Sequence, residues 1–154
     1  NISNWRRPAP NTIPWDSKAA GLYMICTLSK HEAERQGYSE SLMLDHEGNI
    51  AESTSANIFF KDNKGELHTP IPDCFLDGIT RRTVIEIAKS KNIKVHERKI
   101  SPKELPNFVG CFLTGTAAEI TPVSQIADSS YKVCDLIIDL STSYGKLVRK
   151  KKAA

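Results

Sequence analysis

Two kinds of spacing between apolar residues divide the chain into helices and strands. Apolar residues recur at helical intervals over 22–36, over a stretch that opens at Leu76–Thr80 and ends near Asn92, and over 135–150. Shorter apolar or alternating runs predict strands at 41–45, 58–61, 66–69, 94–100, 111–114 and 120–126. Turn signals such as Asp62-Asn63-Lys64-Gly65 separate the strands between 41 and 69, so we expect an antiparallel meander there. The pattern indicates an α/β fold with a mixed, largely antiparallel sheet and packed helices.

Local signals set several boundaries along the chain. Gly37 predicts a left-handed cap that ends the first helix. Ser101-Pro102-Lys103-Glu104 predicts a capping box and a short helix. Three prolines predict an extended interdomain linker or arm over residues 1–16, in which the pair Arg6-Arg7 would be solvated. Residues 17–154 would then form the folded domain.

Composition and charge exclude several classes of protein. At 154 residues, the chain is long enough for one domain with its own core. The net charge is only +3, and much of it lies in 149–152, a solvated tail or a helix end, so we expect no nucleic-acid partner. No apolar run approaches the roughly 20 residues of a membrane span. The chain begins at Asn1 without a leader-like segment, and we expect it to be a piece of a longer protein.

The cysteines and histidines are scattered and form no ligand-spacing motif. The cysteines predict a reduced, cytoplasmic setting, and we expect no metal site and surface positions for the histidines. The residues concerned are Cys26, Cys74, Cys111, Cys134, His31, His46, His68 and His96.

The stretch Gly48–Phe60 carries a lone carboxylate, Glu52, between Ala51 and Ser53 and ahead of an apolar strand. Burying a carboxylate costs several kcal/mol unless it is paired. Glu52 therefore needs a cationic or proton-bearing partner. A structural salt bridge or a cap for the next turn is the ordinary explanation.

Three further features suggest ligand chemistry, each beside an ordinary structural explanation. Lys18 lies among small residues that leave room for a bulky group; when desolvated, its amine would be nucleophilic, although a surface lysine is the commoner case. Gly78-Ile79-Thr80 offers helix amides and a hydroxyl that suit a phosphate, or simple capping. The turn Gly115-Thr116-Ala117-Ala118 could bind a phosphate or carboxylate, or be a plain hairpin.

Together these features match the requirements of pyridoxal 5'-phosphate (PLP). A lysine would hold its aldehyde, an acid facing the ring nitrogen would keep that nitrogen protonated, and the amide-rich turns would hold its phosphate. The partner of Glu52 would then be a pyridinium N–H.

Four blocks carry a resemblance to a known family. They are Arg7–Pro14 ahead of Lys18, Glu52–Phe59, Leu76–Arg81 and Gly115–Val123. From about Trp5 to about Ile126, the chain resembles the C-terminal, larger domain of the class IV (fold type IV) PLP-dependent aminotransferases, most like the branched-chain amino acid aminotransferases. The resemblance implies a pseudo-barrel sheet with packed helices. It also implies a smaller N-terminal domain, absent from this chain, that supplies a phosphate-binding arginine, so the isolated domain would be inactive.

The resemblance also implies a role for each site residue. Lys18 would bind the cofactor covalently and move the proton, while Glu52 faces the pyridine nitrogen and Tyr23 lies near the phenolic oxygen. Leu76 would pack on one face of the ring. Ile79, Thr80 and Thr116 would hold the phosphate, and the amides of Thr116 and Ala117 would bind the substrate carboxylate. The partners would be an amino acid, a 2-oxo acid, the N-terminal domain and at least one further copy of the protein.

Two departures from the family pattern stand out, and two alternatives remain. Ser53 stands where the family often has glycine, and 127–131 replaces a glycine-rich turn. Transamination of branched-chain L-amino acids is the favoured activity. A D-amino acid aminotransferase or aminodeoxychorismate lyase of the same class would share the lysine, the glutamate and both turns. A catalytically silent domain kept for assembly is the alternative from another class.

Overall fold

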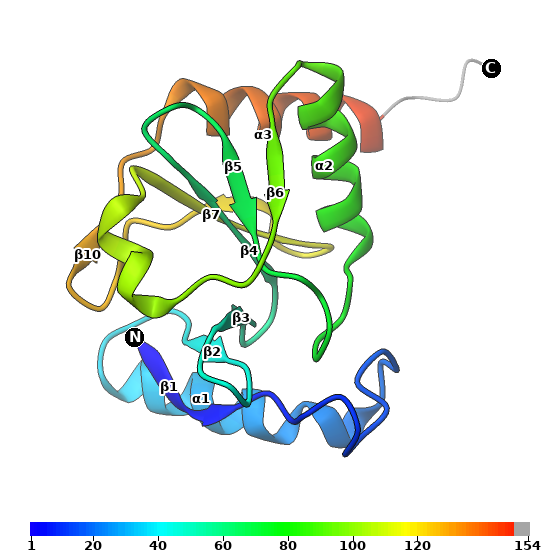
Figure 1. Cartoon of the computed structure of the whole chain (residues 1–154), viewed down its shortest axis with the longest axis vertical. Helices are drawn as coiled ribbons and strands as arrows, with labels where there is room; N and C mark the ends of the chain where they lie inside the picture. The colour runs from blue at the N-terminus through cyan, green and yellow to red at the C-terminus, as the bar shows by residue number, and fades with distance from the viewer. Residues whose placement is uncertain (150–154) are drawn as a thin grey trace.

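The computed structural model describes residues 1–149, and in it two main sheets carry the chain (Figure 1). The first has the order β1-β2-β3 and the second has the order β6-β5-β4-β7-β8. Only β1–β2 and β5–β6 pair in parallel among these described strands, so the expected mixed, largely antiparallel arrangement is confirmed. The strands are β1 (Ile2–Arg6), β2 (Leu42–Leu44), β3 (Ile50–Ser53), β4 (Asn57–Lys61), β5 (Leu67–Thr69), β6 (Val95–Glu97), β7 (Gly110–Gly115), β8 (Glu119–Pro122), β9 (Gln125–Ile126) and β10 (Ser129–Ser130).

Three α-helices pack on these sheets, as the helical spacing predicted. They are α1 (Met24–Arg35), α2 (Ile79–Ser90) and α3 (Asp135–Val148). α1 ends where expected, since Gly37 has a φ of 85°. The capping box at Ser101 is also present and opens the short 3-10 helix Pro102–Asn107; a second 3-10 helix covers Ala20–Leu22. α3 ends at Val148. We expected Lys150 in this helix, but Lys150, Lys151 and Lys152 lie outside the described residues.

The expected meander between 41 and 69 is wrong in one respect, because its hairpins belong to different sheets. β2 pairs with β3 in the first sheet and β4 pairs with β5 in the second. Between β3 and β4, the Ser53 hydroxyl accepts a hydrogen bond from the Ala56 amide and donates one to the Ala56 carbonyl, each at 3.1 Å. Ser53 therefore closes the loop that moves the chain from one sheet to the other.

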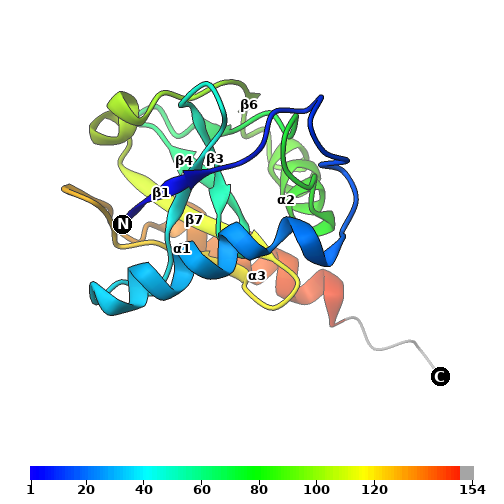
Figure 2. The ribbon, with the colours of Figure 1, turned by 90° about the horizontal axis from the view of Figure 1, so that it is seen from below.

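Residues 1–16 are less linker-like at their start than the prolines suggested. β1 pairs with β2 and lies beside α1 (Figure 2). The Ser3 hydroxyl lies 2.6 Å from that of Ser29 in this helix. Arg7 follows this strand and is only 3% exposed, so the expectation that Arg7 is solvated is wrong. The start of the arm is thus built into the first sheet.

The core lies on both faces of the second sheet. On the face toward α2 and α3, Phe59 and Phe112 stack with ring centroids 5.0 Å apart. On the other face, Phe60 stacks on Phe108 at 4.8 Å. These apolar layers fix the positions of the strand ends that border the cavity described below.

Two smaller expectations need correction. The predicted strand 120–126 is two strands, because β8 ends at Pro122 and β9 pairs with β10. His68 is not a surface residue, since its side chain is 12% exposed and stacks on His96.

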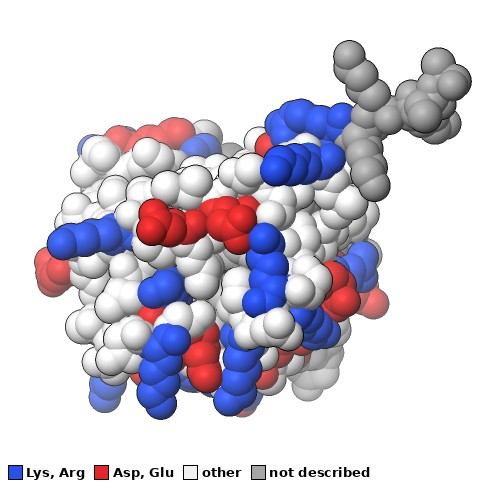
Figure 3. Space-filling model, turned by 90° about the horizontal axis from the view of Figure 1, so that it is seen from above, with Lys and Arg blue, Asp and Glu red and all other residues white. Residues whose placement is uncertain are grey.

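Charges of both signs are interspersed on the face seen in Figure 3. None of the helices within residues 1–149 is long and apolar enough to cross a membrane.

Candidate active site

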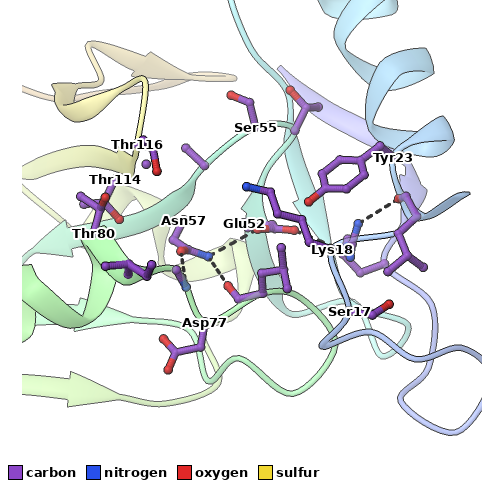
Figure 4. Close-up of a pocket in the computed structure, with 18 residues that line it drawn as sticks. Ser17, Lys18, Tyr23, Glu52, Ser55, Asn57, Asp77, Thr80, Thr114 and Thr116 are labelled. Atoms are coloured by element: carbon purple, nitrogen blue, oxygen red, sulfur yellow. Dashed lines mark hydrogen bonds and ion pairs between the residues drawn. The ribbon is translucent and has the colours of Figure 1, made fainter. Parts of the chain in front are cut away.

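A cavity of about 300 Å³ lies where the first sheet meets the N-terminus of α2 and the β7–β8 turn (Figure 4). Almost all of the residues that the sequence singled out line it; they are Lys18, Tyr23, Glu52, Leu76, Ile79, Thr80 and Thr116. Ala117 is exposed in the same turn and does not line the cavity. Residues that come from four separate stretches of sequence therefore meet at one place.

Glu52 lies on β3 in the middle of the cavity, and its nearest cationic partner is Arg7. The Arg7 Nε atom lies 3.5 Å from Glu52 Oε1. Arg7 is held in place by the carbonyl oxygens of Cys74 and Leu22, each at 3.3 Å. Glu52 was expected to need a cationic or proton-bearing partner, and the protein itself supplies one.

Burial nevertheless dominates the electrostatics of Glu52, whose side chain is 13% exposed. Desolvation raises the pKa of Glu52 to about 8, and the opposing effect of Arg7 is smaller. Burial, followed by the charge of Glu52, also raises the pKa of Tyr23. Glu52 can therefore hold a proton near neutral pH and release it to a basic group that enters the cavity.

Asn57, at the start of β4, connects Glu52 to the N-terminus of α2. Its Nδ2 donates to the Leu76 carbonyl at 2.9 Å and to Glu52 Oε2 at 3.4 Å. Its Oδ1 accepts from the Gly78 amide at 3.1 Å. A Cβ atom on Gly78 would lie 2.4 Å from Asn57 Oδ1, so glycine is required for this close approach.

The N-terminus of α2 forms the opposite end of the cavity from Lys18 and Tyr23 (Figure 4). Gly78 is the N-cap and has no side chain to bond the first-turn amides, which remain available to an anion. Thr80 is buried, and its hydroxyl lies 3.3 Å from that of Tyr144. Thr116, in the β7–β8 turn, lies at the same end of the cavity as Thr80 (Figure 4). Ile79 is 74% exposed at the rim.

Lys18 reaches the cavity from the segment that precedes α1. Figure 4 shows its side chain extending inward from the side of Tyr23. The residue is exposed, so the desolvation that we considered for its amine is not present in the described chain. Within residues 1–149, the structure contains no group of three or more His, Cys, Asp or Glu that could hold a metal ion.

Comparison with known proteins identifies the family. A family model described as amino-transferase class IV matches residues 1–126. The chain belongs to this family. The match ends where the expected resemblance ended, at Ile126, and the divergent hairpin that follows has Ala127 at a positive φ of 47°.

Relatives of this class IV aminotransferase chain carry more specific names. A probable branched-chain-amino-acid aminotransferase of Rickettsia bellii (strain RML369-C) is 45% identical over 156 residues, which cover 96% of this chain and 52% of the relative. The chain thus spans about half the length of the curated relatives it matches.

Solved structures of the family share the fold. The branched-chain amino acid aminotransferase from Thermobaculum terrenum, in its PLP form, is 34% identical, with a TM-score of 0.90 over 96% of this chain and 49% of that one. The Escherichia coli branched-chain amino acid aminotransferase is 37% identical, with a TM-score of 0.90 over 95% of this chain and 49% of that one. The fold expected from the resemblance is confirmed.

Among the residues that line the cavity, sequence reasoning did not single out Arg7, Asn57 as a partner of Glu52, or Thr114. Arg7 could have been found, because Glu52 demanded a cation and this arginine, followed by proline, opens one of the four family blocks. Asn57 was a polar residue at the head of an apolar strand, which is itself a signal. Thr114 gave no signal, since threonine is common in strands.

Proposed function

We propose that this chain is the cofactor-binding part of a PLP-dependent aminotransferase that acts on branched-chain L-amino acids with a 2-oxo acid as acceptor. The observation that carries the proposal is one cavity lined by Lys18, Glu52 and the uncapped N-terminus of α2. The names of the relatives support the branched-chain substrate, and the PLP form of a related solved structure supports the cofactor.

The residues present fit PLP in size and chemistry. A cavity of about 300 Å³ is at the lower end of the roughly 300–1,000 Å³ of ligand sites, and it is open at the rim, where Ile79 is exposed. The hydroxyl of Thr114 is buried without a hydrogen-bond partner among the described residues, and it lines the cavity near the N-terminus of α2, where a phosphate would find helix amides. When bound, PLP would supply the electron sink for chemistry at the substrate Cα.

Lys18 and Glu52 would perform the central tasks. Lys18 would hold the cofactor covalently through Nζ. Its amine, when free, would take up the proton of the substrate Cα and give it back. Glu52 would hold a proton at the ring nitrogen. Its raised pKa supports this role, because the proton that it keeps near neutral pH is available to a basic ring nitrogen.

The remaining residues would orient the cofactor and substrate. Tyr23 would lie near the phenolic oxygen and Leu76 would pack on one face of the ring. Ile79 and Thr80, at the start of α2, would hold the phosphate together with Thr116. The amides of Thr116 and Ala117 would bind the substrate carboxylate.

The working enzyme would contain more than this chain. We propose that an N-terminal domain completes the substrate pocket and that the enzyme works as a dimer or a higher homo-oligomer. The four cysteines are all free within the described residues, which supports the proposed cytoplasmic setting.

Substrate profiling of the full-length protein tests the proposal. The protein, purified with PLP, should be yellow and should convert leucine, isoleucine or valine in the presence of a 2-oxo acid, and Lys18→Ala should abolish both the covalent attachment of PLP and the turnover. Absence of activity on all three amino acids, with activity on D-amino acids instead, would refute the substrate. A colourless wild-type protein in the presence of added PLP would refute the cofactor.

A further inference from the structure

Thr114 is a buried polar residue whose hydroxyl has no hydrogen-bond partner in the described part of the chain. It lies in β7 and is 1% exposed. Within residues 1–149, three buried side-chain atoms lack a hydrogen-bond partner, namely Asn1 Oδ1, Ser41 Oγ and Thr114 Oγ1, and of these residues only Thr114 lines the active-site cavity. An unsatisfied buried hydroxyl lowers stability, whereas valine would fill the same volume without that penalty. The hydroxyl therefore requires a partner that enters from the cavity.

The sheet explains why the side chain of Thr114 faces this cavity. Thr114 is the cross-strand neighbour of Asn57, so both side chains lie on one face. The next cross-strand pair on the same face is Phe59 and Phe112, two residues away in each strand, and these rings stack under α2 and α3. The apolar layer thus gives way to a polar pair where the sheet borders the cavity.

The neighbours of Thr114 indicate an anion. Figure 4 shows Thr80, Thr114 and Thr116 gathered at one end of the cavity, opposite Lys18 and Tyr23. α2 begins at this end with amides that Gly78 cannot cap. The carboxylate at this end, that of Asp77, is already paired with the guanidinium groups of Arg81 and Arg82, at 2.8 and 3.8 Å.

Two threonine side chains are buried at this end of the cavity, Thr80 and Thr114, and in the described chain only the hydroxyl of Thr114 is free to bond a ligand. The Thr80 hydroxyl lies within hydrogen-bond distance of Tyr144, whereas Thr114 Oγ1 has no partner among the described residues. Among the lining residues, the cations are Arg7, beside Glu52, and Lys18, which extends inward from the side of Tyr23 (Figure 4). Neutral hydrogen-bond donors must therefore contribute more of the binding of an anion at the end of the cavity formed by α2.

We propose that Thr114 Oγ1 donates a hydrogen bond to an oxygen of a phosphate monoester bound between the N-terminus of α2 and the β7–β8 turn. The proposal rests on the proposed function, in which that monoester is the phosphate of PLP. Thr114 is then a binding residue whose hydroxyl is left unsatisfied in the apo protein and is satisfied when the phosphate binds.

Two variants of the full-length protein, Thr114→Val and Thr114→Ser, test this assignment. The valine variant keeps the shape and removes the donor, while the serine variant keeps the donor. Equilibrium dialysis would measure the Kd for PLP, for pyridoxal, which lacks the phosphate, and for inorganic phosphate. A hydrogen bond to a charged group contributes about 1.5–3 kcal/mol, which corresponds to a rise in Kd of about 10- to 150-fold.

We expect Thr114→Val to raise the Kd for PLP and for inorganic phosphate by at least about tenfold and to leave that for pyridoxal within about threefold. Thr114→Ser should stay within about threefold of the wild type for all three ligands. The apo valine variant should melt no lower than the apo wild type, because it loses an unsatisfied group.

Other outcomes would overturn the assignment. A valine variant that melts lower in the apo form but binds PLP and phosphate normally would make Thr114 a structural residue. Equal losses for PLP and pyridoxal would assign the hydroxyl to the ring instead of the phosphate. If the wild type binds no PLP, the proposed function fails, and the phosphate measurements alone then decide the role of Thr114.

Discussion

The raised pKa of Glu52 predicts that the apo protein loses stability as the pH rises. An unfolded glutamate titrates near 4.5, whereas burial raises the pKa of Glu52 to about 8 in the folded protein. Between these values the folded state keeps a proton that the unfolded state has released. The free energy of unfolding that this group contributes is therefore full below pH 4.5 and is lost as the pH rises to about 8.

The size of the effect follows from the same two values. Each pKa unit corresponds to about 1.4 kcal/mol, so the shift from 4.5 to about 8 gives at most about 5 kcal/mol. Glu52→Gln keeps the shape of the side chain and cannot titrate. The wild type should therefore lose about that much stability, relative to the glutamine variant, between about pH 4.5 and about pH 8.5.

Urea denaturation of the apo full-length protein and of Glu52→Gln, at half-unit pH steps, measures this difference directly. Other titrating groups cancel, because both proteins share them. A difference that is flat, or that grows with pH, would refute the reasoning; it would mean that Arg7 keeps the carboxylate ionised in spite of its burial. PLP should flatten the difference in the holo protein, because a ring cation would stabilise the ionised form of Glu52.

Three further changes test the neighbouring contacts. Arg7→Met should raise the pKa of Glu52 further, because it removes the cation that favours the ionised carboxylate. When Arg7→Met is added to both the wild type and Glu52→Gln, the pH at which the stability difference between the two proteins is lost should rise. If that pH does not change, Arg7 does not act on Glu52. Gly78→Ala should destabilise the protein by about 1–3 kcal/mol in urea, because Asn57 Oδ1 must move, whereas Gly21→Ala, with no atom within 4 Å of the new Cβ, is the matched control. Lys18→Ala should change the apo melting temperature little, because Lys18 is exposed, while borohydride reduction no longer attaches PLP covalently to the protein; retained covalent attachment would exclude Lys18 as the attachment site.

Local signals predicted the elements of this fold better than they predicted the assembly of its sheets. The helix end at Gly37 and the capping box at Ser101 depend on backbone and side-chain chemistry within a few residues, and both are present. The division of the meander into two sheets places β4 beside β7, a pairing that joins residues as far apart in sequence as Asn57 and Thr114. The same holds for the parallel pairing of β1 with β2, which joins residues as far apart in sequence as Ile2 and Leu42.

The candidate site divides in the same way. Lys18, Glu52 and the two turns were visible because their chemistry is unusual for their local sequence. Arg7 was misjudged, because solvation is the common state of an arginine and its burial depends on two carbonyl groups from distant segments. Thr114 could be found only in three dimensions, since a missing partner is a property of the folded surroundings.

The loose contacts around Glu52 suggest how the site is prepared for its ligand. Arg7 and Asn57 approach the two carboxylate oxygens at 3.5 and 3.4 Å, longer than the roughly 2.7–2.9 Å of a strong charge-assisted bond. The same chain builds a tight pair elsewhere, since buried Arg81 contacts Glu97 at 2.8 Å. A pair as tight as that would keep Glu52 ionised and satisfied without a ligand. The looser arrangement fixes the carboxylate in place, lets burial keep its proton near neutral pH, and leaves its strong hydrogen bond to a group that enters the cavity.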